Sequence, residues 1–251
     1  MKRVLLKLSG EALAGEQKRG FDEATVTEVA KQIKTIVDEG LQVGIVIGGG
    51  NFWRGRTSGA MDRSKADQIG MLATIMNCIY VSDICRYVGL KTEVFTPFVC
   101  GAFTTLYSKD AVEESFAAGK VVFFAGGTGH PYFSTDTATV LRAVEIGADA
   151  IAHGSTGAGN DQIRFDMTFL VMAPGMEIIT LTRDSNLSRQ EEVDYLNQHG
   201  YYADFTKLKY SYNVGIWGTS ICGGEILDSN QGLPESAYLK HPTKTGTELL
   251  K

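Results

Sequence analysis

The stretch Gly126–Asp136 lies between an apolar run and a helical pattern, and this arrangement limits the folds open to the chain. Val121–Ala125 is typical of a buried strand, and Thr137–Ile146 predicts a helix. A glycine-rich turn between them brings backbone N–H groups and a helix N-terminus to an anion. A helix cap needs only one polar side chain, whereas this turn has three glycines and the side chains of Thr128, Ser134, Thr135 and Asp136. The sequence therefore favours an anion site over an ordinary capped turn.

The same pattern of a strand ending in glycine occurs twice earlier in the chain. Arg3–Leu8 reads as a strand followed by Ser9-Gly10, and Leu41–Ile47 runs into three glycines. The helix predicted between them starts after Asp22 and ends near Glu39. A right-handed crossover makes the two strands parallel, so both turns fall at the edge where open α/β sheets bind ligands. Neither a P-loop nor a dinucleotide-binding fingerprint is present, and the pattern predicts a nucleotide or phosphate ligand without a defined reaction.

Strands and helices continue to alternate, which predicts an α/β fold with an open, largely parallel sheet flanked by helices. The further predicted elements are the helix 63–88, the strand 91–95, the helix 109–118 capped by Ser108, and the strand 120–125. The net charge of −5 and the lack of a basic stripe argue against a nucleic-acid partner. The four cysteines lack metal-site spacing, and no metal-binding side-chain set is predicted. The N-terminal apolar run is short, and we expect a cytoplasmic protein without a membrane partner.

Four motifs in order resemble the bacterial UMP kinases of the amino-acid-kinase superfamily. They are Lys7–Leu13, Val46–Gly55, Ala66–Thr74 and Gly127–Asp136. The resemblance covers about residues 1–151 and implies that ATP contacts Lys7, Leu8, Ser9, Gly10, Gly50 and Arg54. It implies that UMP contacts Gly49, Asp67, Thr128, Gly129, His130, Pro131, Tyr132, Phe133, Ser134 and Thr135.

The candidate catalytic residues are Lys7, Arg54 and Asp136, which lie beside the glycine turns in the sequence. Lys7 and Arg54 would stabilise negative charge on the transferred phosphoryl group. The resemblance further implies Mg²⁺ bound with ATP, small-molecule nucleotides as ligands, a homo-oligomer that is a hexamer in the family, and regulation by GTP and UTP.

From about Gly147 the chain departs from the UMP kinase pattern. The family continues with a Lys-containing turn, an Asp-Gly-Val-Tyr loop that grips ATP, and an Asp-bearing helix start, none of which is present. The chain instead has a strand at Ala150–His153, a glycine turn, and a helix carrying Asn160, Asp161 and Arg164, and a further strand is predicted over 177–181. Asp161 and Arg164 share a helix face, which fits either a surface ion pair or recognition of a zwitterionic ligand.

This second part is similar to argininosuccinate synthase, on the motifs Ala152–Arg164, Leu187–Leu196 and Tyr210–Ser220. The resemblance runs from about residue 147 to the end and implies part of that enzyme's nucleotide-binding domain. It assigns Gly154 to ATP, Thr156, Asn160 and Asp161 to aspartate, and Asn160, Arg164, Ser211 and Ser220 to citrulline. The synthase's pyrophosphate loop and its long C-terminal region are absent.

Two joined resemblances lead to the hypothesis of a chimera, with a UMP kinase-like domain at 1–151 and a synthase-like fragment at 152–251. Recombination, deliberate construction and a sequence-assembly error would each produce such a join. Three functions follow: a UMP kinase, an argininosuccinate synthase-like ligase, and a catalytically inactive UMP-binding protein. We expect the strand Ala150–His153 to continue the sheet of the first part.

Overall fold

The computed structural model describes residues 2–17, 19–53, 61–154, 160–184, 189–198, 210–215, 218–223, 225 and 228–238. The chain forms two compact units, Met1–Leu187 and Ser188–Lys251. The first unit carries the sheet predicted from the sequence, and it is the unit that positions the candidate site.

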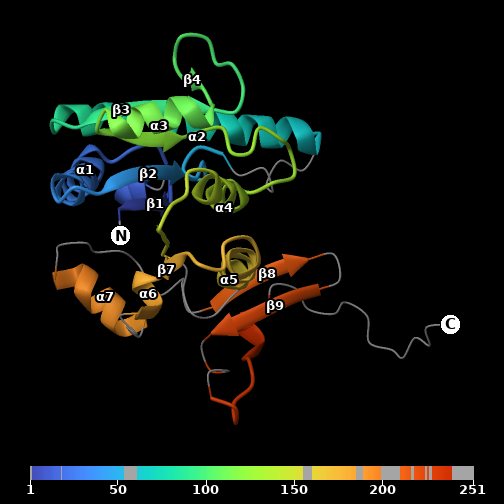
Figure 1. Ribbon diagram of the computed structural model, residues 1–251. Coiled ribbons are helices and arrows are strands. Elements are labelled where there is room, and N and C mark those ends of the chain that lie inside the picture. Colours follow the sequence, from blue (N-terminus) through green and yellow to red (C-terminus); the bar gives the residue numbers. More distant parts are fainter. Residues whose placement is uncertain are drawn as a thin grey trace. The chain divides into compact units, whose positions relative to one another are not determined.

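A seven-stranded sheet in the order β4-β3-β5-β2-β1-β6-β7 forms the centre of the first unit (Figure 1). Every pairing in it is parallel. The strands are β1 (Arg3–Leu8), β2 (Gln42–Ile47), β3 (Lys91–Thr96), β4 (Thr105–Leu106), β5 (Lys120–Phe124), β6 (Ala150–Ala152) and β7 (Glu177–Ile179). Strands buried on both faces need continuous apolar runs, which is the pattern of the β2 and β5 sequences.

Helices cover both faces of this sheet. On one face, α1 (Glu23–Asp38) and α2 (Arg63–Tyr87) pack against β-strand side chains such as Val43 and Phe123. On the other, α3 (Lys109–Ala117), α4 (Thr135–Glu145) and α5 (Asn160–Met172) pack against residues such as Leu5 and Phe124. The alternation of β5 side chains between the two faces therefore divides the core into two layers. A 3₁₀ segment, Ala12–Gln17, and the short helix α6 (Leu181–Asp184) complete the unit.

The structure confirms the predicted α/β class and the continuation of the sheet. β6 pairs with β1 through Val4–Ala150, Leu5–Ile151 and Leu6–Ala152, so the strand from the second resemblance extends the sheet of the first. The caps predicted at Asp22 and Ser108 also form, because each side chain accepts a hydrogen bond from a backbone N–H in the first turn.

Two predicted boundaries differ from the structure by more than one residue. The helix expected to begin at Thr137 begins at Thr135, because Ser134 caps it by accepting a hydrogen bond from the Thr137 N–H. The strand expected over 177–181 ends at Ile179, and Leu181 begins α6 instead. There the Asp184 carboxylate accepts hydrogen bonds from the N–H and hydroxyl of Thr180, which stabilises the helix start.

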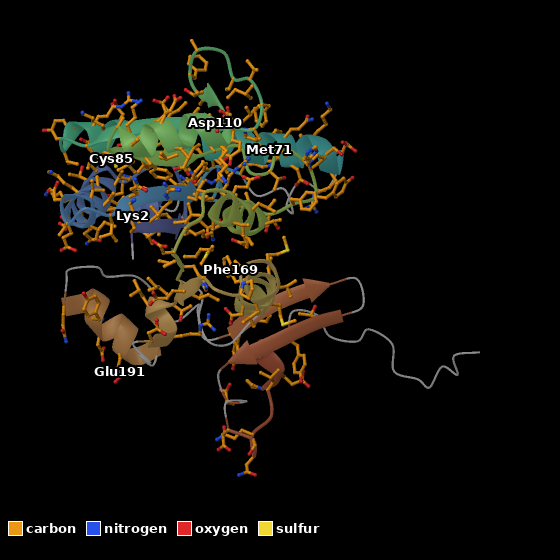
Figure 2. The ribbon with its side chains drawn as sticks, viewed as in Figure 1. Lys2, Met71, Cys85, Asp110, Phe169 and Glu191 are labelled. Carbon is orange, nitrogen blue, oxygen red and sulfur yellow. The ribbon has the colours of Figure 1, made fainter. Side chains whose placement is uncertain are left out.

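Among the described residues, α2 is the helix long and apolar enough by length and composition to cross a membrane. Half of its most apolar stretch is buried within the unit, and the buried residues of the helix include Cys78, Val81 and Cys85. Figure 2 shows Cys85 among the side chains of this layer. A core helix that packs on a sheet can be as long and as apolar as a membrane-spanning helix. The apolar composition of α2 is therefore explained by its place in the core.

The second unit contains α7 (Arg189–Gln198), the antiparallel pair β8 (Tyr210–Gly215) and β9 (Gly218–Gly223), and a 3₁₀ turn at Glu235–Ala237. Two tyrosines of β8 hold the segments that follow the pair. The Tyr210 hydroxyl bonds to the Glu225 carboxylate at 2.5 Å, and the Tyr212 hydroxyl donates to the Ala237 carbonyl at 2.9 Å.

Candidate functional site

The turns after β1, β2 and β5 lie side by side at one sheet edge, because these three strands are adjacent and parallel. Two buried asparagines fix the first two turns to each other. Asn77 of α2 donates to the Gly48 carbonyl at 2.6 Å and to Asn51 Oδ1 at 2.8 Å. Asn51 donates to the Gly20 carbonyl at 2.9 Å and to Asn77 Oδ1 at 3.0 Å. Their amides therefore replace the water that would otherwise solvate the turns.

Gly10 fits against this pair so closely that no side chain can replace its hydrogen. A Cβ there would lie 2.3 Å from the Gly48 oxygen, 2.5 Å from Asn51 Oδ1 and 2.7 Å from Asn77 Nδ2. The sequence predicted a ligand role for Gly10, and the structure adds close packing between two turns.

The third turn is tied to α2 by two further side chains. The Thr74 hydroxyl accepts a hydrogen bond from the Gly126 N–H at 2.8 Å and donates to the Met71 carbonyl at 2.7 Å. Asp67 accepts the Tyr132 N–H at 2.7 Å, and Tyr132 has a φ of 70°. Arg63 also bonds to Asp67, at 2.9 Å. α2 therefore holds the loop of the third turn at both its start and its middle.

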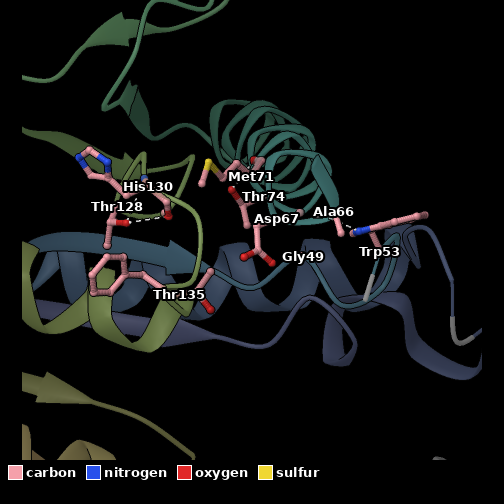
Figure 3. Close-up of a pocket in the computed structure, with 12 residues that line it drawn as sticks. Gly49, Trp53, Ala66, Asp67, Met71, Thr74, Thr128, His130 and Thr135 are labelled. Carbon is pink, nitrogen blue, oxygen red and sulfur yellow. Dashed lines mark hydrogen bonds between the residues drawn. The ribbon is translucent and has the colours of Figure 1, made fainter. Parts of the chain in front are cut away.

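A cavity of about 140 Å³ opens between α2 and the turns. Figure 3 shows Asp67 and Thr74 of α2 across this space from Thr128 and Thr135. Six of the residues predicted to contact UMP line it: Gly49, Asp67, Thr128, His130, Phe133 and Thr135. Four others, Gly129, Pro131, Tyr132 and Ser134, belong to the same loop but do not line the cavity. The cavity combines hydroxyls, one carboxylate and glycine backbone, which are groups that bind a small polar ligand.

Lys7 and Asp136 form an ion pair beside this cavity. The Lys7 ammonium lies 3.2 Å from Asp136 Oδ1, and about a quarter of each side chain is exposed. Lys7 comes from β1, and Asp136 directly follows Thr135 at the start of α4, where negative charge is favoured by the helix dipole. Two of the three candidate catalytic residues are thus brought together by the fold.

The turn after β6 carries His153, which lies near the charged side chains of Arg183 on α6 and Asp166 on α5. His153 is buried, and its backbone N–H donates to the Ile179 carbonyl at 3.1 Å. Burial lowers the pKa of His153, and the nearby Arg183 charge lowers it further. Arg183 binds Asp166 through two hydrogen bonds of 2.6 and 2.9 Å, which hold the pKa of Asp166 below its usual value.

Several predicted site residues lie outside the described part of the chain. Arg54 and Thr156 are among them, and so are the side chains of Asn160, Asp161, Arg164, Ser211 and Ser220. Gly154 is described, and it lines a groove together with Lys7, Leu8 and Ser9. Within the described ranges, no three His, Cys, Asp or Glu side chains gather as metal ligands would. The Asp136 carboxylate beside Lys7 is nevertheless of the type that assists a Mg²⁺ ion bound chiefly by nucleotide phosphates.

The sequence reasoning did not identify the groups that position the site. Asn51, Thr74 and Asn77 bind the glycine turns, and Trp53 donates to the Ala66 carbonyl at 2.9 Å beside the cavity. A polar signal was available, because Asn77 stands between Met76 and Cys78 in an apolar stretch of helix. A buried amide in such a place needs partners, and here they are the two turns.

Comparison with sequence families gives two matches to different parts of the chain. The amino acid kinase family matches residues 2–156, and the arginosuccinate synthase N-terminal HUP domain matches residues 133–201. The two matches overlap at 133–156, which includes Asp136 and β6. The first covers more than half of the chain, whereas the second covers a short segment.

Several curated proteins and solved structures that resemble the chain are named as uridylate kinases or UMP kinases. Uridylate kinase of Streptococcus thermophilus is 42% identical over 207 residues, which cover 77% of this chain and 84% of the relative. Uridylate kinase of Limosilactobacillus reuteri is 48% identical over 158 residues, or 62% of this chain and 66% of the relative. The crystal structures of UMP kinase from Bacillus anthracis and Ureaplasma parvum are 36% and 32% identical, each with a TM-score of 0.59 over 63% of this chain. The matched parts are 66% and 70% of those chains.

Proposed function

This chain belongs to the amino acid kinase family, and on that premise we propose that it is a UMP kinase-like phosphotransferase. The proposed reaction transfers the γ-phosphoryl group of ATP to UMP, giving UDP and ADP, in the pyrimidine nucleotide pathway of the cytoplasm. The observation that carries the proposal is the Lys7–Asp136 ion pair beside a cavity lined by the predicted UMP residues.

UMP would occupy the cavity between α2 and the loop after β5. Thr128 and Thr135 offer hydroxyl donors, and the glycine turns offer backbone N–H groups to its phosphate. Asp67, which already anchors the Tyr132 N–H, would accept hydrogen bonds from hydroxyls of the nucleotide. The α4 N-terminus adds a favourable dipole at the phosphate end.

Lys7 would stabilise the charge that accumulates on the transferred phosphoryl group, and Arg54 would do so from the turn after β2. Asp136 would hold the Lys7 ammonium in place, since the two groups already lie 3.2 Å apart. Mg²⁺ bound to the ATP phosphates would neutralise further charge. Catalysis of this kind depends on positioning, and the buried Asn51–Asn77 pair supplies the rigidity.

The test is UDP formation from UMP and Mg-ATP by the purified full chain, with Asp136→Asn as a control. UDP formed by the unaltered chain and lost in the variant would support the kinase. UMP bound by well-folded protein without UDP would instead indicate the inactive UMP-binding protein. Measuring UMP affinity by calorimetry beside turnover separates these outcomes.

The match to the arginosuccinate synthase HUP domain favours a second candidate, a ligase-like fragment that binds aspartate or citrulline. The residues predicted to contact aspartate or citrulline are Thr156, Asn160, Asp161, Arg164, Ser211 and Ser220, and Gly154 is predicted to contact ATP. Aspartate or citrulline binding in the absence of UMP binding would support this candidate over the kinase. The overlap of the two family matches also supports the proposed chimera, and resequencing the source locus tests it, since two separate reading frames would exclude a natural fusion.

We also propose that the chain forms a homo-oligomer. Leu72, Met76 and Ile79 lie at helical spacing on α2, and all three are exposed in the single chain. An apolar stripe of this kind on a long helix fits a symmetric contact with a second copy.

A further inference from the structure

The loop between β5 and α4 contains one residue in a costly backbone conformation. Tyr132 has a φ of 70°, and within the described ranges it is the one residue other than glycine with a positive φ. Residues with a Cβ rarely adopt that region, because the Cβ then approaches the backbone too closely. The Tyr132 side chain is 66% exposed, so packing does not hold it there. A specific contact must therefore keep the residue in this conformation.

Two charged side chains at the start of α2 supply that contact. Asp67 accepts the Tyr132 N–H at 2.7 Å. The Arg63 Nε donates to both oxygens of Asp67, at 2.9 and 3.0 Å. The Arg63 guanidinium carbon also lies over the Tyr132 ring, 5.8 Å from its centroid, where the ring face attracts a cation. Arg63 therefore contacts both partners of the hydrogen bond that fixes the loop.

The three side chains differ in how they meet the candidate UMP cavity. Asp67 lines it, as Figure 3 shows, whereas Arg63 and Tyr132 do not. A carboxylate accepts about four hydrogen bonds, so Asp67 can hold Tyr132 and still accept a bond from a ligand hydroxyl. His130 and Phe133, which lie on either side of Tyr132 in the sequence, both line the cavity. The position of this cavity wall therefore depends on the backbone at Tyr132.

Loss of these contacts would allow the loop to relax. Tyr132 would return to the negative-φ region that is ordinary for a tyrosine, and the neighbouring peptide planes would rotate, which moves His130 and Phe133. A ligand would then have to use part of its binding energy to restore the costly conformation. Arg63 removes that cost from binding, because it holds Asp67 and Tyr132 in place beforehand.

We propose that Arg63 is a positioning residue for the monophosphate acceptor, acting through Asp67 and Tyr132. The proposal rests on the proposed function in taking UMP as the ligand of the cavity. Arg63 sets the affinity for UMP without contacting it. The Lys7–Asp136 pair lies on β1 and α4, so Arg63 affects acceptor binding and not phosphoryl transfer.

Calorimetry of UMP binding to the full chain is the first test. Arg63→Ala is expected to weaken binding about tenfold, and Arg63→Lys, which keeps the charge, should recover part of the loss. Lys65→Ala is the matched control, because Lys65 is an exposed cation in the same turn of α2 and its ammonium bonds to Gln68. It should bind UMP as the unaltered chain does. Equal UMP affinities of Arg63→Ala and Lys65→Ala would overturn the proposal.

A double-mutant comparison separates positioning through Tyr132 from the simple loss of a nearby charge. Glycine adopts a φ of 70° without a Cβ penalty, so Tyr132→Gly removes the conformation that needs to be held. In that background Arg63→Ala should weaken UMP binding by about threefold or less. The same tenfold loss in both backgrounds would overturn the proposal, since Arg63 would then act without Tyr132.

Hydrogen exchange at the Tyr132 amide reports on the loop in the absence of any ligand. Exchange should be about tenfold faster in Arg63→Ala than in the unaltered chain, because the hydrogen bond to Asp67 opens more often. It should be unchanged in Lys65→Ala. Unchanged exchange in Arg63→Ala would overturn the proposal.

The kinase and the role of Arg63 can fail independently. In an active chain, Arg63→Ala should raise the KM for UMP about tenfold and leave kcat within about twofold. UDP formation with an unchanged KM for UMP would retain the kinase and reject the role of Arg63. Faster exchange and weaker UMP binding in Arg63→Ala, from a chain that forms no UDP, would retain the role and reject the kinase. A well-folded chain that binds no UMP would reject both.

Discussion

Replacing Gly10 with alanine tests whether the packing between the first two turns is as rigid as the structure indicates. The added Cβ would meet the Gly48 oxygen at 2.3 Å, Asn51 Oδ1 at 2.5 Å and Asn77 Nδ2 at 2.7 Å. The first neighbour is backbone and the other two are buried amides bonded to each other, so none of the three can move aside without cost.

The magnitude follows from two contributions. Overpacking of this kind costs about 1–3 kcal/mol, and a buried amide pushed off its partner costs about 1–3 kcal/mol more. We therefore expect the free energy of unfolding to fall by about 2–6 kcal/mol. With a typical denaturant slope of about 2 kcal/mol per M, the urea midpoint should fall by about 1–3 M. UMP affinity should fall as well, because Gly48 and Gly49 shift with the clash.

The assay is urea unfolding followed by far-UV circular dichroism, with Gly175→Ala as the matched control. A Cβ at Gly175 meets no atom within 4 Å, so that variant should change stability by less than about 0.5 kcal/mol. If Gly10→Ala lowered the midpoint no more than Gly175→Ala, the turns would be free to separate, and the argument for a rigid site would be wrong.

Three further predictions concern the core of the site, its pH dependence and its assembly. Asn77→Leu should lower the free energy of unfolding by about 2–4 kcal/mol, because Asn51 Oδ1 and the Gly48 carbonyl lose the hydrogen bonds that Asn77 donates to them; a urea midpoint equal to that of the unaltered chain would contradict this. Burial lowers the pKa of His153 from 6.5, and the charges of Arg183 and Lys7 lower it further, whereas Asp166 and Asp136 oppose the shift. The unfolded chain therefore takes up a proton at higher pH than the folded chain does. As a result, the free energy of unfolding decreases as the pH falls below about 6.5. His153→Gln should therefore lose less stability than the unaltered chain between pH 7.5 and 5.5. An identical loss in the two proteins would show that His153 does not cause this pH dependence. Met76→Glu places a charge in the exposed α2 stripe and should shift sedimentation toward smaller species, whereas an unchanged sedimentation coefficient would exclude this stripe as the contact.

Much of the first unit could be predicted because its patterns are local. Continuous apolar runs mark strands buried on both faces, and Asp22 and Ser108 mark helix starts by their ability to bond backbone N–H groups. The end of β7 was missed, because the Thr180–Asp184 contact that starts α6 leaves no signal in apolar periodicity. The two sets of predicted ATP contacts, at Lys7–Ser9 and at Gly154, came from separate resemblances and carried no information about each other.

The sequence by itself determined the fold class and the placing of three glycine turns at one edge, since right-handed crossovers between parallel strands leave little choice. Only the tertiary structure decided that Lys7 meets Asp136, that Asn77 joins two turns, and that Ser9 and Gly154 share a groove. These contacts depend on the order of strands across the sheet, with β1 between β2 and β6. That order results from the packing of both core layers together, and no stretch of sequence records it on its own.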